Sequence, residues 1–243
     1  MSSRVGNFSS SEIHKLMSKA AGNWNLEKPG KPFFTYVRDK VWETRLGRSL
    51  TQRQNSRITT WGLFVEKIVF DKLGMDYKLE SRTRYAHPEI ERWTGMPDVI
   101  TRDGSKVGDI KCPWTLLSFC EMADAMAEGW EELKKTKPEY YWQLVSSSVL
   151  TGAKYAELIV YVPYKSELQE IKDAANNHAW DGTLSENDVQ FINYATDEEL
   201  PYLKEGKAYP NLISLEFEVP QEDKDLLTAR VKLAVAELEK QLG

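Results

Sequence analysis

Residues 156–162 restrict the fold more than any other segment, because they form an almost continuously apolar run. A short apolar run of this kind is typical of a strand that is buried on both faces. Such a strand lies in the middle of a sheet and needs helices on both sides. We therefore expect an α/β protein with a mixed central sheet flanked by helices.

The rest of the chain supplies the other elements of this sheet and its cover. Hydroxyl residues at 9–11 predict a capped helix that ends near Gly22. Apolar spacing and proline positions predict further helices over 33–46, 57–73, 116–137, 139–150 and 220–242. Strands are expected over 76–86, in a hairpin at 95–112, over 156–162 and over 213–219.

Composition narrows the class of protein. The chain has 243 residues, of which 41% are hydrophobic and 28% charged, so we expect a fully folded single domain. No apolar run is long enough for a membrane span and the N-terminus lacks a signal peptide, so we expect a cytoplasmic protein. The two cysteines are expected to be reduced. The three histidines are scattered, so a metal here would be bound by oxygen.

Charge is distributed unevenly along the chain. The net charge is -5, but residues 1–60 carry +7 and the remainder -12. A basic N-terminal part joined to an acidic remainder suits a protein that presents one face to phosphate groups. A helical surface that is simply rich in lysine and arginine explains the asymmetry equally well.

The hairpin at 95–112 carries the chemistry. Asp103-Gly104 is a signal for a tight two-residue turn, and a turn centred there places Asp98 opposite Asp109. Two carboxylates this close need compensation, which a divalent cation such as Mg²⁺ or Mn²⁺ provides. Strand alternation puts Lys111 on the same face as Asp109, where an ammonium can orient water or stabilise a phosphoryl transition state. The alternative is a surface hairpin with incidental acids.

These residues form a recognisable motif. Pro97-Asp98 followed by Asp109-Ile110-Lys111 resembles the signature of PD-(D/E)xK nucleases. The extension into Cys112-Pro113 is similar to a run in the phage lambda exonuclease and YqaJ-like viral recombinase family. That family also has a helical glutamate before the hairpin and a Tyr-x-x-Gln helix after it, matched here by Glu66 and by Tyr140 to Gln143. Its opening pattern is matched by Arg4 to Glu12, so the resemblance spans residues 4 to about 163.

The resemblance implies a role for each matched residue. Two Mg²⁺ ions, with Mn²⁺ as a substitute, would be held by Asp98, Asp109, Glu66 and the Ile110 carbonyl. Catalysis would also use Lys111 and Gln143, with Tyr140 as an auxiliary residue. Arg4 and Ser11 would bind the 5′-phosphate of DNA. From the residues alone, Glu66 also fits a salt bridge to arginine, Ser11 a plain helix cap, and Tyr140 a core position.

The resemblance likewise implies a function. It predicts a restriction-endonuclease-like core and a magnesium-dependent, phage-type alkaline exonuclease that degrades double-stranded DNA from 5′ to 3′. Recombination with a single-strand annealing partner, a trimeric assembly and the host cytoplasm follow from the same source. We expect one nuclease domain over 1–243, with a DNA-end-binding part at 1–56, a catalytic core at 57–163 and an acidic extension at 164–243.

Two other functions fit the same residues. An endonuclease or nickase can use the same core, because catalytic residues do not encode a requirement for an end. A non-catalytic DNA-end binder that acts as a recombination scaffold is the second, although the acids at 98 and 109 and the lysine at 111 are those of an active nuclease.

Overall fold

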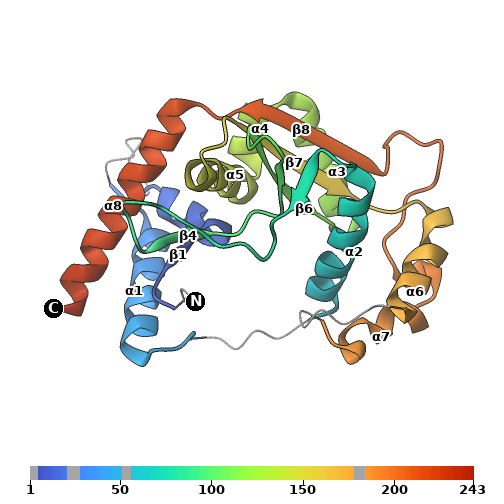
Figure 1. Ribbon diagram of the computed structural model, residues 1–243, viewed down its shortest axis with the longest axis horizontal. Coiled ribbons are helices and arrows are strands. Elements are labelled where there is room, and N and C mark those ends of the chain that lie inside the picture. Colours follow the sequence, from blue (N-terminus) through green and yellow to red (C-terminus); the bar gives the residue numbers. More distant parts are fainter. Residues whose placement is uncertain (1–4, 21–27, 51–55, 178–183) are drawn as a thin grey trace.

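The computed structural model describes residues 5–20, 28–50, 56–177 and 184–243. Its main sheet has the strand order β2-β5-β6-β7-β8. The strands are β2 (Tyr77–Leu79), β5 (Val99–Thr101), β6 (Lys106–Lys111), β7 (Tyr155–Tyr161) and β8 (Leu212–Glu218). Within this sheet, as described, β6 and β7 pair in parallel and the other neighbouring strands pair antiparallel. The expected mixed sheet flanked by helices is confirmed (Figure 1).

A second, three-stranded sheet lies apart from the first. It has the order β1-β4-β3, formed by β1 (Phe8–Ser9), β4 (Trp93–Gly95) and β3 (Tyr85–Ala86). The single strand expected over 76–86 is therefore wrong, since its two ends belong to different sheets. A turn in which Thr83 N donates to Glu80 O at 2.7 Å redirects the chain between them.

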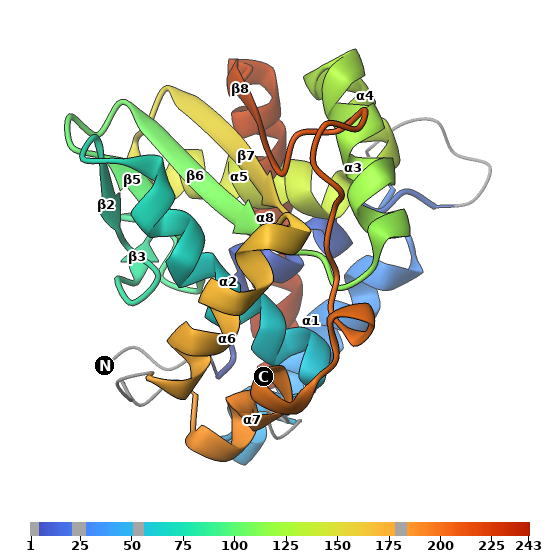
Figure 2. The same ribbon diagram turned by 90° about the vertical axis from the view of Figure 1, so that its right-hand side faces the viewer.

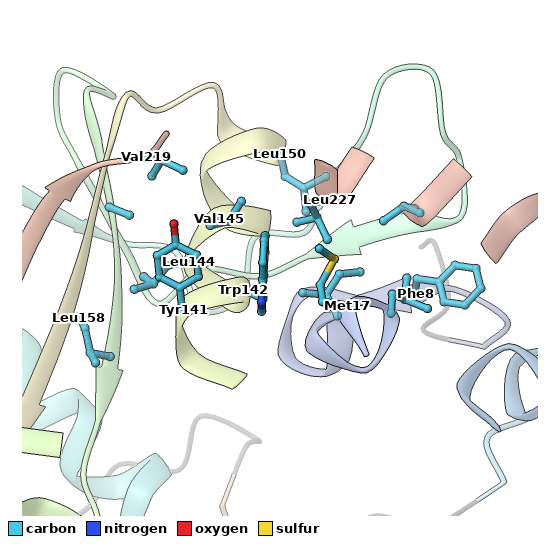
Figure 3. Packing of buried hydrophobic residues seen from close by; sticks show 14 of the residues in the cluster. Phe8, Met17, Tyr141, Trp142, Leu144, Val145, Leu150, Leu158, Val219 and Leu227 are labelled. Carbon is cyan, nitrogen blue, oxygen red and sulfur yellow. The ribbon is translucent and has the colours of Figure 1, made fainter. Parts of the chain in front are cut away.

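One face of the main sheet packs on the larger hydrophobic core. Ala156, Leu158 and Val160 of β7 belong to it. The helices on this side are α3 (Leu116–Glu128), α4 (Trp130–Thr136), α5 (Pro138–Thr151) and α8 (Gln221–Leu242), with α1 (Lys31–Leu46) and the 3-10 helix η1 (Ser10–Met17) beyond α5. Figure 3 shows the α5 side chains between Leu158 of the sheet and Met17 and Leu227 of the outer helices.

The opposite face packs on a second core, which contains Ile159 and Tyr161 of the same strand. This strand is therefore buried on both faces, as the sequence predicts. The covering helices are α2 (Arg57–Leu73), α6 (Leu168–Asn176) and α7 (Glu186–Tyr194), which lie on the same side in Figure 2. Two short 3-10 helices lie in the connections: η2 (Lys165–Glu167) between β7 and α6, and η3 (Asp197–Glu199) between α7 and β8.

Two helix predictions need correction. The N-terminal helix is a 3-10 helix that ends at Met17, whereas the end expected near Gly22 falls outside the described residues. The single long helix expected over 116–137 is two helices, since Gly129 adopts a φ of 107° between α3 and α4. Only glycine takes this conformation readily, so the chain changes direction there. In the described part of the chain no helix is long and apolar enough to cross a membrane.

Replacing Arg230 by methionine is expected to stabilise the protein. Arg230 lies on α8 with 4% of its surface exposed, and neither Nη1 nor Nη2 has a hydrogen-bond partner among the described residues. Burial lowers its pKa, yet an arginine stays charged. An unpaired buried charge is unfavourable, so Arg230→Met should raise the free energy of unfolding by about 1–3 kcal/mol in urea titrations. A loss of stability in this variant would show that the guanidinium is compensated.

Candidate active site

The hairpin has the expected register but a different turn. Val99 pairs with Gly108, as a turn centred on Asp103-Gly104 requires. However, Gly104 N donates to Thr101 O at 2.9 Å, so the turn itself is centred one position earlier, on Arg102-Asp103. Gly104 follows with a φ of 74°. The register is kept because a four-residue loop replaces the two-residue loop without shifting the strands.

The structure brings Asp98, Asp109 and Lys111 together at the end of β6. Asp98 Oδ2 accepts a hydrogen bond from Ile110 N at 2.7 Å, which fixes it against the neighbouring strand. Lys111 Nζ lies 2.6 Å from Asp109 Oδ2. On the other side, Gln143 Nε2 of α5 donates to Asp109 Oδ1 at 2.5 Å. Both Asp109 and Lys111 thus face α5, and Asp109 is held between an ammonium and an amide.

The acids strongly influence one another. Burial, followed by the charges of Asp109 and Glu66, raises the pKa of Asp98 well above its ordinary range. Burial opposes the charge of Lys111, but Asp109 and Asp98 outweigh it and raise the pKa of this lysine. Lys111 is therefore an ammonium at neutral pH. It lies 5.5 Å from the centre of the Tyr140 ring, which supports the cation from α5.

Glu66 comes from α2. Burial, together with the charge of Asp109, raises its pKa to about 7. Among the described residues Glu66 forms no hydrogen bond and no ion pair, so the arginine salt bridge left open by the sequence is absent from that part of the chain. A half-buried carboxylate with no such partner is expected to attract a proton or a cation.

A cavity of about 500 Å³ lies in front of these residues. The start of α2, the end of β6 and the start of α3 surround it, and its lining includes Glu66, Ile110, Lys111, Cys112, Trp114 and Tyr140. Cys112 is a free thiol, and burial raises its pKa, which favours the neutral thiol over the nucleophilic thiolate. Lys111 and Glu66 are therefore both accessible from this cavity.

Two predicted residues remain: Ser11 lies near Gln143, and Arg4 lies outside the described residues. Ser11 is the second residue of the 3-10 helix η1 and, with Gln143, lines a second and much smaller cavity. Arg84 also lines the small cavity, although nothing in its local sequence marks it, because it belongs to an irregular loop before β3. Of the neighbours of Gln143 on α5, Tyr140 faces Lys111 and Trp142 is buried in the core.

The donors suit a hard divalent cation. Asp98, Asp109, Glu66 and the Ile110 carbonyl offer only oxygen, which Mg²⁺ and Mn²⁺ prefer. Within the described ranges, no three His, Cys, Asp or Glu side chains are preassembled as a metal site. Mg²⁺ does not require such a set, because it keeps several waters and commonly binds through one or two carboxylates. The unpartnered Glu66 carboxylate and the mutual repulsion of the acids fit such an ion.

Stabilisation by Mg²⁺ is expected to depend on pH. Glu66 has a folded pKa of about 7 against an ordinary value of 4.5, so the folded chain holds a proton that the unfolded chain releases in this window. Without a cation, the contribution of Glu66 to the free energy of unfolding therefore falls as pH rises from 4.5 to about 7. A bound cation replaces that proton, so the affinity of the site for Mg²⁺ should fall roughly tenfold per pH unit below about 7. Melting curves with and without Mg²⁺ should show a larger gain in Tm at about pH 8.5 than at about pH 5.5.

The control for this prediction is Glu66→Gln, which cannot hold the proton. Its Mg²⁺-dependent gain in Tm should be smaller and should vary less with pH. An equal gain at both pH values in the parent protein would mean that the cation does not displace a proton from these acids.

Solved structures show which proteins share this architecture. The alkaline exonuclease LHK-Exo from Laribacter hongkongensis superposes with a TM-score of 0.62 and 16% identity, covering 98% of this chain and 91% of that one. Its complex with dAMP gives the same values. This chain shares the fold of that exonuclease. A phage-related exonuclease from Haemophilus somnus 129PT is similar too, with a TM-score of 0.60, 16% identity and coverage of 97% and 95%.

The likeness lies in structure rather than in overall sequence. No protein-family model matches the chain, and a comparison with curated proteins gives no significant match. The nuclease fold predicted from the short motifs around the hairpin is confirmed by these structures. The roles of the individual residues stay predictions.

Proposed function

We propose that this chain is a metal-dependent exonuclease that degrades double-stranded DNA from a 5′ end. The observation that carries the proposal is the grouping of Asp98, Asp109 and Lys111 at the end of β6, beside an open cavity, in an exonuclease fold. Phosphodiester hydrolysis needs acids for a cation and a cationic group near the reacting phosphate. This site offers both.

The chain's own residues have distinct tasks in this proposal. Asp98, Asp109, Glu66 and the Ile110 carbonyl would hold Mg²⁺, which when bound polarises the phosphate and lowers the pKa of water. Lys111 Nζ, held 2.6 Å from Asp109, is placed to donate to the attacking water or to the charge that develops on phosphate. Gln143 keeps the Asp109 carboxylate in one orientation through its amide.

Product and biological setting are part of the same proposal. LHK-Exo has been solved in complex with dAMP, and we infer that deoxynucleoside monophosphates are the product of this chain. Digestion from 5′ to 3′ would leave a single strand for an annealing protein in phage-type recombination in the host cytoplasm. The resemblance in the sequence supports this setting, along with a trimeric assembly.

A digestion assay tests the function. Purified protein with Mg²⁺ should degrade linear duplex labelled at its ends and leave closed circular duplex intact, and chelation of the metal should stop the reaction. Prompt cutting of circles would instead favour an endonuclease or nickase. Binding of linear duplex without any digestion would favour a DNA-end-binding scaffold.

A further inference from the structure

Another large cavity, the α2–α7 pocket, lies between the start of α2 and α7, which pack side by side in Figure 1 and Figure 2. It measures about 470 Å³, within the roughly 300–1,000 Å³ that is typical of small-ligand sites. Polar and aromatic side chains from the two helices and from the segment after α7 line it: Arg57, Thr60, Asn187, Asp188, Gln190, Phe191, Tyr194, Ala195 and Glu199.

The α2–α7 pocket shares a wall with the active-site cavity. The first turn of α2 borders both spaces, since Thr59 lines the active-site cavity and Thr60 lines the pocket. An aromatic contact completes the wall. The ring of Trp114, which lines the active-site cavity, meets the ring of Phe191 edge to face at 5.9 Å. A ligand in the pocket therefore lies one helical turn and one pair of rings away from the active-site cavity.

Tyr194 offers a ring for stacking at this pocket. It is the last residue of α7, and 79% of its surface is exposed. Phe191 does not offer its ring in the same way, because the Arg57 guanidinium lies over it with Cζ 5.5 Å from the ring centre. Exposed aromatic rings beside a cavity suit unpaired nucleobases, because every base has a flat π-face that can stack.

The polar groups of the pocket match a base better than a phosphate. Its lining has two carboxylates, Asp188 and Glu199, against the single guanidinium of Arg57, so an anion is disfavoured. Asn187 and Gln190 add amides that both donate and accept, and neither forms a hydrogen bond within the described ranges. The edge of a nucleobase likewise carries donors and acceptors without a charge.

We propose that the α2–α7 pocket binds a base of the complementary DNA strand, which becomes unpaired as the active site digests its partner. The inference rests on the proposed function and adds a subsite to it. The strand whose phosphate reaches Lys111 lies on one side of the first turn of α2, and its unpaired complement can follow the other side. Stacking on Tyr194 then holds the complement away from the reacting end.

The test compares the affinity of the protein for a blunt duplex, for the same duplex with a short 3′ overhang on the complementary strand, and for one whose overhang has the same backbone without bases. Fluorescence anisotropy in the presence of a metal chelator measures binding without digestion. The parent should bind the normal overhang on the order of tenfold more tightly than the other two, because base–aromatic stacking has an effect of this size. Tyr194→Ala should lose this preference and keep the affinity for the blunt duplex.

The matched control is Tyr194→Phe, which keeps the ring and removes the hydroxyl. This variant should retain the preference for the normal overhang. Both variants should melt at the parent's temperature, because Tyr194 is exposed and makes no hydrogen bond with the described residues.

Each result is decisive. An overhang preference that survives Tyr194→Ala overturns the assignment, and so does equal affinity for overhangs with and without bases. A parent that does not distinguish the overhang from the blunt end overturns the base subsite but leaves the nuclease open to the digestion assay. A preference that depends on Tyr194, in a protein that digests no DNA, supports this inference while the proposed function fails.

Discussion

Replacing Asp109 by asparagine is expected to lower the rate of DNA hydrolysis on the order of a thousandfold without unfolding the protein. Asparagine keeps the shape of the side chain and can still accept the hydrogen bond from Gln143 Nε2. It loses the charge that Lys111 pairs with and that a cation requires. Rates should be measured on linear duplex with saturating Mg²⁺, alongside melting curves that confirm folding.

The hairpin contains its own control for this experiment. Asp103→Asn changes an exposed acid of the same loop, and its Oδ1 can still accept from Ser105 N and from the Thr101 hydroxyl. This variant should digest DNA at nearly the parental rate. Lys111→Met should resemble Asp109→Asn, because it removes the ammonium beside the acid. Parental rates for both Asp109→Asn and Lys111→Met would exclude the hairpin from the chemistry.

The grouping of Asp98, Asp109 and Lys111 can be predicted from the sequence because its determinants are local. Strand alternation places Asp109 and Lys111 on one face, and a short loop sets the register of Asp98 whichever pair of residues centres the turn. Glu66 could be found because an acid in a largely apolar helix needs an explanation. The hairpin alone groups Asp98, Asp109 and Lys111, whereas Glu66 reaches them only when α2 packs against β6.

The parts that the sequence does not reveal depend on distant segments. Arg84 meets Gln143 and the serines only after β3, η1 and α5 have packed together, and its neighbours in sequence give no sign of this. The break at Gly129 is hidden because helical spacing continues on both sides of it. The segment 76–86 reads as one strand, but its pairing partners lie in separate sheets, and pairing is decided by tertiary packing.

Of the substitutions considered, replacing Asp223 by alanine is expected to lower the free energy of unfolding the most. Asp223 is 2% exposed in the first turn of α8 and accepts hydrogen bonds from Lys134 Nζ, at 2.7 Å to each oxygen, and from Tyr141 OH at 2.6 Å. One carboxylate thus joins α8 to α4 and α5. Alanine leaves a buried hydroxyl and an ammonium without their acceptor, which typically costs 3–5 kcal/mol. Because Lys134 is partly open to water, we expect about 3 kcal/mol, measured by urea titration.

Two companion variants separate the carboxylate's role from simple loss of charge. Asp223→Asn keeps one acceptor for Tyr141 and should lose less stability than alanine. Glu132→Ala breaks the more exposed pair with Lys135 and should change the free energy of unfolding by less than about 1 kcal/mol. If Asp223→Ala costs no more than Glu132→Ala, the buried carboxylate does not hold α8 to α4 and α5. A large loss would show that the C-terminal helix stabilises α5, the helix that presents Tyr140 and Gln143 to the acids.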